Sequence, residues 1–176
     1  MTDTSADAET SFQQAVEAFN SSNLDLAINL LKTTVLLSPG YADAYNYLGQ
    51  AYFKKEEYQD SVDYFNKALE IQPEHAGACY NLGVALQKQG RLEESIDAYQ
   101  QAIHIQPDYA GAYNNLGNAL QEQGRLKESI QACHQAIHIQ PDHANAYSNL
   151  GVALQKQDRL EESIQAYQQA IRIQPD

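Results

Sequence analysis

Residues 81–108 read NLGVALQKQGRLEESIDAYQQAIHIQPD, and residues 149–176 read NLGVALQKQDRLEESIQAYQQAIRIQPD. The two segments lie 68 positions apart and are identical at 25 of 28 positions. Half of that offset, 34 residues, also aligns glycines, serines, alanines and leucines of the sequence between them. All prolines of the chain obey this period: Pro39, Pro73, Pro107, Pro141 and Pro175. A repeat of fixed length therefore organises the chain.

The period divides the chain into five units, of which the last is one residue short. They are residues 8–41, 42–75, 76–109, 110–143 and 144–176. The first unit has diverged, because Ala15 replaces the glycine that the other units carry. The glycine column consists of Gly49, Gly83, Gly117 and Gly151. Residues 1–7 lie outside the repeats, and we predict that they form a disordered tail.

Each unit has the pattern of two helices joined by a tight turn. In residues 110–123 the apolar side chains recur at three- and four-residue spacings, the pattern of one helical face. A second such stripe follows Gly124, which supplies the turn, and Pro141 ends the second helix because it lacks a backbone donor. Small residues at the helix crossings allow close approach of the backbones. One unit cannot bury its apolar face alone, so we predict an all-α solenoid of ten stacked helices.

The pattern resembles the tetratricopeptide repeat over about 95% of the chain, and it is most similar to repeats of bacterial members and of O-linked N-acetylglucosamine transferases. The matching residues of the second unit are Tyr45, Leu48, Gly49, Tyr52, Ser61, Phe65, Ala68 and Pro73. The resemblance implies a right-handed α-solenoid. It also implies that the first helix of each unit lines a concave face that binds extended segments or helices of other proteins.

Two departures from the family pattern concern single positions. Asp158 replaces the turn glycine of the last unit, and modest strain is expected if this position adopts a left-handed conformation. Cys79 and Cys133 occupy columns that hold aromatic residues in other units. We interpret both cysteines as buried packing residues and not as a redox pair, because two repeats separate them.

The first helices are predicted to present an amide-rich surface for protein or peptide binding. The candidate residues are Tyr47, Gln50, Asn81, Val84, Lys88, Asn114, Asn115, Asn118, Asn149, Val152 and Lys156. Asn81, Asn115 and Asn149 recur one repeat apart, and an asparagine can both donate to and accept from a bound backbone. The alternative is that these amides bond to the neighbouring helix or to water.

The first two units carry aromatic residues on the same face, notably Phe12, Phe19 and Phe53. They suit an apolar anchor of a partner, and an equally open interpretation is that they fill space left by missing consensus residues. Family members that bind chaperone tails clamp a terminal carboxylate with Lys and Arg. Here the corresponding positions hold Asn, Gln, Val and Tyr, so this mode is not expected.

The composition limits the other classes of function. The formal net charge is -12, which disfavours nucleic acid as a partner. We find no membrane span and no signal peptide, and two cysteines fit a reducing compartment, so the chain is expected to be cytoplasmic. No catalytic motif, metal site or cofactor site is predicted. His104 and His138 share a column with Leu36, Glu70 and Arg172, which indicates a solvated position.

The sequence ends at Asp176 without an extra polar helix that would cover the last repeat. Part of Leu160, Ile164, Tyr167 and Ile171 should then be exposed. A longer parent protein, end-to-end self-association or simple tolerance of the patch would each explain it. Two functions stay open: a non-catalytic adaptor for protein assembly, and the substrate-recognition region of a larger enzyme such as a glycosyltransferase.

Overall fold

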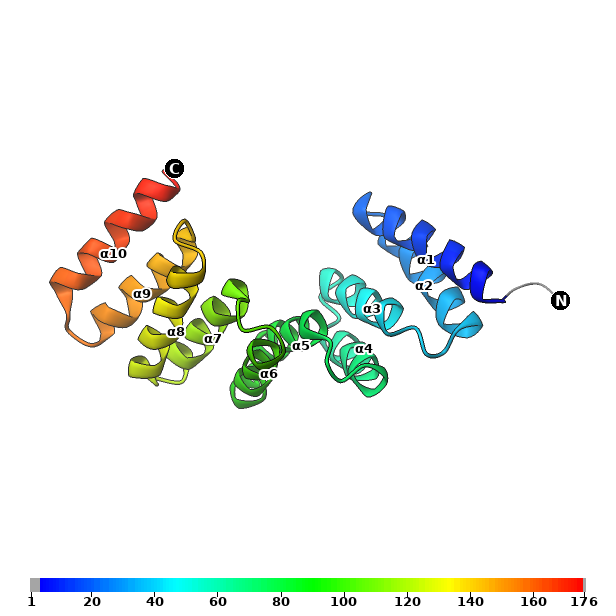
Figure 1. Ribbon diagram of the computed structural model, residues 1–176, viewed down its shortest axis with the longest axis horizontal. Coiled ribbons are helices and arrows are strands. Elements are labelled where there is room, and N and C mark those ends of the chain that lie inside the picture. The colour runs from blue at the N-terminus through cyan, green and yellow to red at the C-terminus, as the bar shows by residue number, and fades with distance from the viewer. Residues whose placement is uncertain (1–3, 176) are drawn as a thin grey trace. The chain divides into compact units, whose positions relative to one another are not determined.

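The computed structural model describes residues 4–175, in which ten α-helices and no strand occur. Their bounds are α1 Thr4–Asn20, α2 Leu24–Leu37, α3 Ala42–Lys54, α4 Tyr58–Ile71, α5 Ala76–Lys88, α6 Leu92–Ile105, α7 Ala110–Glu122, α8 Leu126–Ile139, α9 Ala144–Lys156 and α10 Leu160–Ile173. Each predicted repeat holds two of them (Figure 1). The all-α solenoid of five helix-turn-helix units is therefore confirmed.

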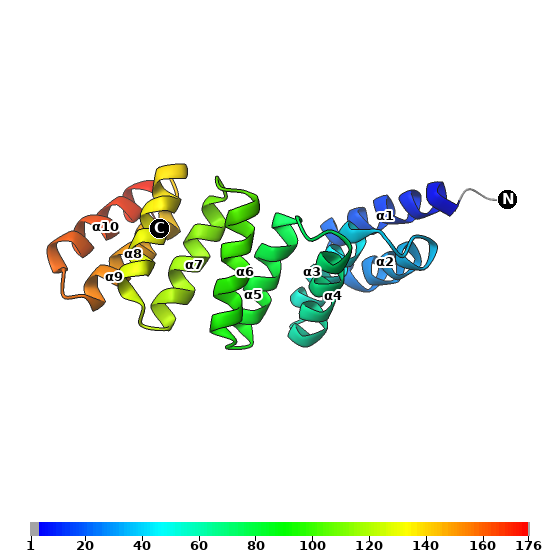
Figure 2. The ribbon, with the colours of Figure 1, turned by 60° about the horizontal axis from the view of Figure 1, so that its bottom comes forward.

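The chain divides into two compact units at the turn that follows α5. Unit 1 runs to Gln89 and contains α1 to α5, and unit 2 begins at Gly90 and contains α6 to α10. Within unit 1, α1 packs against α2 and α3 against α4, and both α1 and α5 contact α3 (Figure 2). Within unit 2, α8 contacts both α7 and α9, and α10 packs on α9. The boundary falls inside the predicted third repeat, 76–109.

The first helix begins earlier than predicted. We expected residues 1–7 to be a disordered tail, but α1 starts at Thr4, so residues 4–7 are helical and the prediction was wrong for them. Asp7 lies in the first turn, where its charge complements the helix dipole, and the next residue, Ala8, is buried. Residues 1–3 of the predicted tail lie outside the described residues.

All five hairpin turns use the same backbone conformation at the same place of the repeat. The residues there have positive φ: Ser22 at 60°, Glu56 at 62°, Gly90 at 74°, Gly124 at 78° and Asp158 at 61°. This confirms the left-handed turn considered for Asp158. Only two of the five are glycine, so three turns carry the cost of a side chain in this region, roughly 1–2 kcal/mol each.

The glycine column marks the closest approach between the two helices of a repeat. A Cβ added to Gly49 would lie 2.5 Å from the Phe65 ring, and one added to Gly151 would lie 2.8 Å from the Tyr167 ring. At Gly117 the same atom would meet Cys133 Sγ at 2.8 Å. As predicted, small residues at the helix crossings allow the two backbones to approach closely.

The serine column ties the same helix pairs together in unit 2. Ser129 Oγ donates to the Gly117 carbonyl at 2.7 Å, and Ser163 Oγ donates to the Gly151 carbonyl at 2.8 Å. Both serines are buried, so each bond satisfies a hydroxyl that water does not reach. In unit 1 the buried Ser61 hydroxyl has no such partner.

The two cysteines are fully buried and free. Burial raises the pKa of Cys79 to about 11. Burial also raises the pKa of Cys133 to about 11, although a hydrogen bond with Ser129 acts in the opposite direction. Both thiols thus act as packing residues, as the sequence predicted.

The outer face of α10 is apolar and exposed. Ile164 is 55% exposed, whereas its equivalent one repeat earlier, Ile130, is 7% exposed because α9 packs against α8. Leu160 and Ile171 are exposed as well, as expected from the sequence. In the described part of the chain, no helix is long and apolar enough to span a membrane.

Candidate functional site

In unit 1 the first helix α3 contacts both α1 and α5, and α3 and α5 present the predicted binding residues of that unit. Tyr47, Gln50, Asn81 and Val84 are half-buried, so each offers part of its side chain to solvent. Lys88 is exposed at the end of α5. The structure thus brings these predicted residues of α3 and α5 to adjacent helices.

In unit 2, α7 and α9 contact each other and carry the remaining predicted residues. Asn115, Asn118, Asn149 and Val152 are half-buried and Lys156 is exposed. Asn114, in contrast, is buried, with only 8% of its surface exposed. Its amide therefore serves mainly as a partner for other side chains.

The predicted asparagine ladder is hydrogen-bonded within the protein. Asn81 Nδ2 donates to Asn46 Oδ1 at 3.1 Å in unit 1, and Asn149 Nδ2 donates to Asn114 Oδ1 at 2.9 Å in unit 2. Of the two interpretations left open by the sequence, bonding to the neighbouring helix is thus realised for Asn81 and Asn149. Each amide has two N–H donors and two acceptor lone pairs, so one bond leaves capacity for a ligand.

Asn46 was missed as a ladder member. It is buried on α3 and accepts the bond that holds Asn81 in place. Asn46 and Asn114 are equivalent residues two repeats apart, but the same column holds Tyr80 and Ser148 in other units. Asparagine thus recurs in this column only at every second repeat, a spacing of 68 residues, and comparison of successive repeats does not reveal it.

A cavity of ≈220 Å³ opens on the first-helix face of unit 1, and we call it the aromatic pocket. Its lining consists of Phe19, Gln50, Phe53, Lys54, Phe65, Tyr80, Asn81 and Val84. Three predicted site residues, Gln50, Asn81 and Val84, are among them. Lys54 Nζ lies 4.0 Å from the centroid of the Phe19 ring, a cation–π contact.

A second cavity of ≈450 Å³ lies between α1 and α3, and we call it the acidic pocket. It is lined by Glu9, Phe12, Gln13, Val16, Asp43 and Tyr47. Tyr47 is a predicted site residue, and Phe12 belongs to the aromatic groove expected in the first units. The two carboxylates were missed: Glu9 and Asp43 share one repeat column, but its other members are Gly77, Gly111 and Asn145, so the acid recurs only in the first two units.

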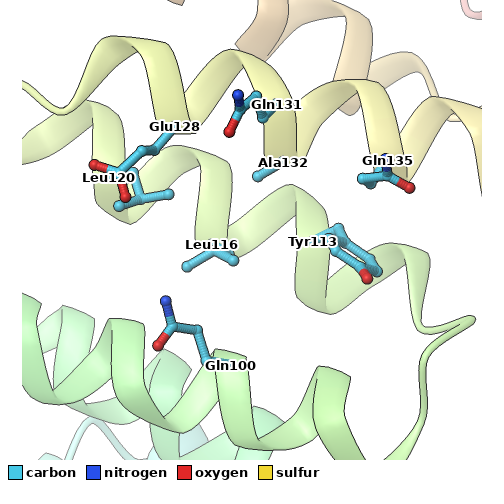
Figure 3. Close-up of a pocket in the computed structure, with 8 residues that line it drawn as sticks. All are labelled: Gln100, Tyr113, Leu116, Leu120, Glu128, Gln131, Ala132 and Gln135. Carbon is cyan, nitrogen blue, oxygen red and sulfur yellow. The ribbon is translucent and has the colours of Figure 1, made fainter.

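A third cavity, of ≈480 Å³, lies in unit 2 on the side of the second helices (Figure 3). Gln100 of α6 and Gln131 and Gln135 of α8 flank it, and Tyr113 and Leu116 of α7 lie between these two helices (Figure 3). Sequence reasoning placed no site here. The lining has one carboxylate, Glu128, which is bound by Arg125.

Acidic side chains at the starts of the second helices are explained by local ion pairs. A hydrogen bond from Arg125 lowers the pKa of Glu128, and Arg159 lowers the pKa of Glu162 in the same way. Arg91 does the same for Glu94. The paired side chains are exposed and lie three residues apart, so the carboxylates support the starts of the second helices. Within residues 4–175, no group of three or more potential metal ligands occurs.

Family profiles match most of the repeat region. Profiles described as Tetratricopeptide repeat match residues 42–75, 64–97 and 108–176. One described as TPR repeat matches residues 88–124. Together they span residues 42–176. A search of curated protein sequences finds no match.

Solved structures share the fold over nearly the whole chain. A MamA crystal structure is 24% identical, with a TM-score of 0.86, over 98% of this chain and 93% of that one. PilF of Pseudomonas aeruginosa is 18% identical, with a TM-score of 0.87, over 96% and 77%. YrrB, described as a TPR protein with an unusual peptide-binding site, is 27% identical, with a TM-score of 0.80, over 94% and 86%. On the repeat length, the helix pairs and these matches, the chain belongs to the tetratricopeptide repeat family.

Proposed function

We propose that the chain is a non-catalytic scaffold that binds peptide or protein segments on the face lined by its first helices. The observation that carries this proposal is the aromatic pocket of unit 1. It opens on that face and contains Gln50, Asn81 and Val84, which the repeat pattern had selected independently as binding residues. An apolar pocket with a few placed polar groups is the usual form of a recognition site.

The chemistry of the pocket suits a peptide more than a small charged metabolite. Phe19 and Phe53 offer apolar surface for a side chain, while the amides of Gln50 and Asn81 can bond to a backbone. Each amide bond contributes only about 0.5–1.5 kcal/mol, so the apolar side chain supplies most of the affinity. YrrB is described as a TPR protein with an unusual peptide-binding site, and its similarity to this chain supports the same class of ligand.

The remaining asparagines extend the surface beyond the pocket. Asn149 in unit 2 is half-buried and held by Asn114, which fixes its orientation before any ligand arrives. Such preorganisation reduces the entropy that binding must overcome. We infer that Asn115, Asn118, Asn149 and Val152 add weak, sequence-tolerant contacts to a segment that is anchored elsewhere.

Selection from a random peptide library, followed by fluorescence polarisation with the selected peptides, tests the proposal. A Gln50→Ala, Asn81→Ala and Val84→Ala triple variant should bind these peptides at least about tenfold more weakly, equivalent to ~1.4 kcal/mol. Asn66→Ala is the matched control, because Asn66 is an exposed amide on α4, outside the pocket. Peptides that bind the triple variant and the parent chain equally would place recognition on another surface.

A further inference from the structure

The ring of Tyr47 links the aromatic pocket and the acidic pocket of unit 1. Phe12 and Phe19 both meet the Tyr47 ring edge to face, each with ring centroids 5.5 Å apart. Phe12 and Tyr47 line the acidic pocket, and Phe19 lines the aromatic pocket. The two cavities are therefore neighbours on one continuous aromatic surface of α1 and α3.

Glu9 is held in place at the acidic pocket without an opposite charge. Its Oε2 accepts a hydrogen bond from the Tyr41 hydroxyl at 2.7 Å, and its Oε1 accepts one from Gln13 at 3.3 Å. Burial, together with this bond, raises the pKa of Tyr41 to about 12, so the phenol stays a neutral donor at physiological pH. A carboxylate has about four acceptor sites, so Glu9 can still accept from a ligand.

Asp43 is oriented in a similar way by His75. The Nδ1 atom of His75 accepts the Ala78 amide at 3.2 Å, which leaves Nε2 as the donor nitrogen of the ring. Its Nε2–H then donates to Asp43 Oδ1 at 3.1 Å. Within the described residues no lysine or arginine forms an ion pair with Glu9 or Asp43. Two carboxylates without a lysine or arginine partner thus edge an aromatic cavity, and His75 is the only ring nitrogen donor that contacts either of them in the described part of the chain.

The aromatic pocket does not favour a cation. Its wall at Phe19 is already covered by the ammonium group of Lys54, 4.0 Å from the ring centroid. Phe65, which is buried, lines the pocket beneath. A second cation would meet repulsion from Lys54, whereas an uncharged apolar side chain would contact the rings. The two neighbouring cavities therefore favour different side chains.

We propose that unit 1 selects segments that carry a basic side chain followed or preceded, at short spacing, by an apolar one. The arginine or lysine enters the acidic pocket, where the carboxylates of Glu9 and Asp43 and the rings of Phe12 and Tyr47 contact it. The apolar side chain enters the aromatic pocket. This inference rests on the proposed function, and it specifies the ligand class for the same face.

The geometry of α3 sets the spacing between the two side chains. Tyr47 and Phe53 are six residues apart on the helix, which corresponds to ~9 Å along its axis. An extended peptide rises ~3.3 Å per residue, so ~9 Å corresponds to about three residues. A peptide of the form Arg-Xaa-Xaa-Phe matches this distance. The net charge of -12 also draws basic segments toward the protein.

The test uses the full chain and fluorescein-labelled octapeptides measured by fluorescence polarisation. The peptides contain Arg-Ala-Ala-Phe, Gln-Ala-Ala-Phe or Arg-Ala-Ala-Ala in a Gly-Ser background. We expect the first to bind about three- to tenfold more tightly than either of the others. The Glu9→Gln and Asp43→Asn double variant should lose the preference for arginine over glutamine and keep the preference for phenylalanine over alanine.

Glu70→Gln with Glu74→Gln is the matched control, since it removes the same charge from exposed positions of unit 1 away from the pockets. It should keep the arginine preference. If the Glu9 and Asp43 variant keeps that preference, or the control loses it too, the acidic pocket is not the determinant and the inference is overturned. Equal binding of the arginine and glutamine peptides, still weakened by the Gln50, Asn81 and Val84 changes, refutes the inference alone. Binding that none of these variants alters refutes the proposed function as well.

Discussion

Gly49→Ala is expected to destabilise the protein even though alanine is the better helix former. A Cβ at this position would lie 2.5, 2.6 and 2.9 Å from three atoms of the Phe65 ring. Phe65 is 1% exposed, so its ring cannot swing into solvent. The α3·α4 pair must separate, or the ring must leave its rotamer, to admit one methyl group.

The size of the effect follows from two opposing contributions. Alanine in a helix is more favourable than glycine by about 1 kcal/mol, whereas overpacking a core costs about 1–3 kcal/mol. Three ring atoms inside 3 Å place Gly49→Ala in the upper part of that range, for a net loss of about 1–2 kcal/mol. Gly151→Ala should be near neutral, because the Tyr167 ring that it meets is partly exposed and can move.

Urea unfolding followed by far-UV circular dichroism measures both variants. A second change, Phe65→Leu, should relieve the clash, so the Gly49→Ala and Phe65→Leu pair should show a favourable coupling of about 1 kcal/mol in a double-mutant cycle. Hydrogen exchange of the α3 amides locates the loss. If Gly49→Ala costs no more than Gly151→Ala, the close approach of the helices at Phe65 is not what keeps this position a glycine.

Three further predictions concern the turns and the titrating groups. Glu56→Gly should stabilise the chain by about 1 kcal/mol in urea unfolding, because glycine removes the cost of positive φ at this turn; an unchanged midpoint would contradict that cost. Cys79 and Cys133 should resist N-ethylmaleimide at pH 8 in the folded chain and react at once in denaturant, since burial raises both pKa values to about 11; fast native labelling would show open packing. The ultraviolet titration of Tyr41 should show a pKa near 12, lowered by Glu9→Gln, and its stabilising contribution is complete below about pH 10 and is lost as the pH rises toward 12.

The repeat pattern predicted the fold because the same close contact between two helices recurs in successive repeats. Glycine must stand where an aromatic ring or Cys133 crosses, and the period of 34 residues exposed that requirement at Gly117 and Gly151. In the diverged first unit the period that ends at Pro39 predicted a helix pair, and α1 and α2 form one, although α1 starts before the predicted unit. The start of α1 was missed because polar residues at a helix start carry no period.

The binding face was predictable only as a surface, not as pockets. Tyr47, Gln50 and Asn81 were found because residues of the first helices share a face. Glu9 and Asp43 were not, although they share one repeat column, because the last three units hold no acid there and the two side chains meet only when α1 and α3 pack. Likewise, the bond from Asn81 to Asn46 joins different columns of neighbouring repeats, which comparison of equivalent positions does not pair.

The five turn residues with positive φ have a consequence for engineering by insertion. All five, from Ser22 to Asp158, are exposed, and their backbone conformation is the same although four different amino acids occupy them. The flanking helices therefore impose the turn whichever amino acid occupies this position. Exposed tips of this kind accept inserted segments, and each doubling of a flexible loop costs only about 0.6 kcal/mol. The hairpin tips thus provide five equivalent points at which epitopes, tags or reporter domains can be grafted without disturbing the first-helix face.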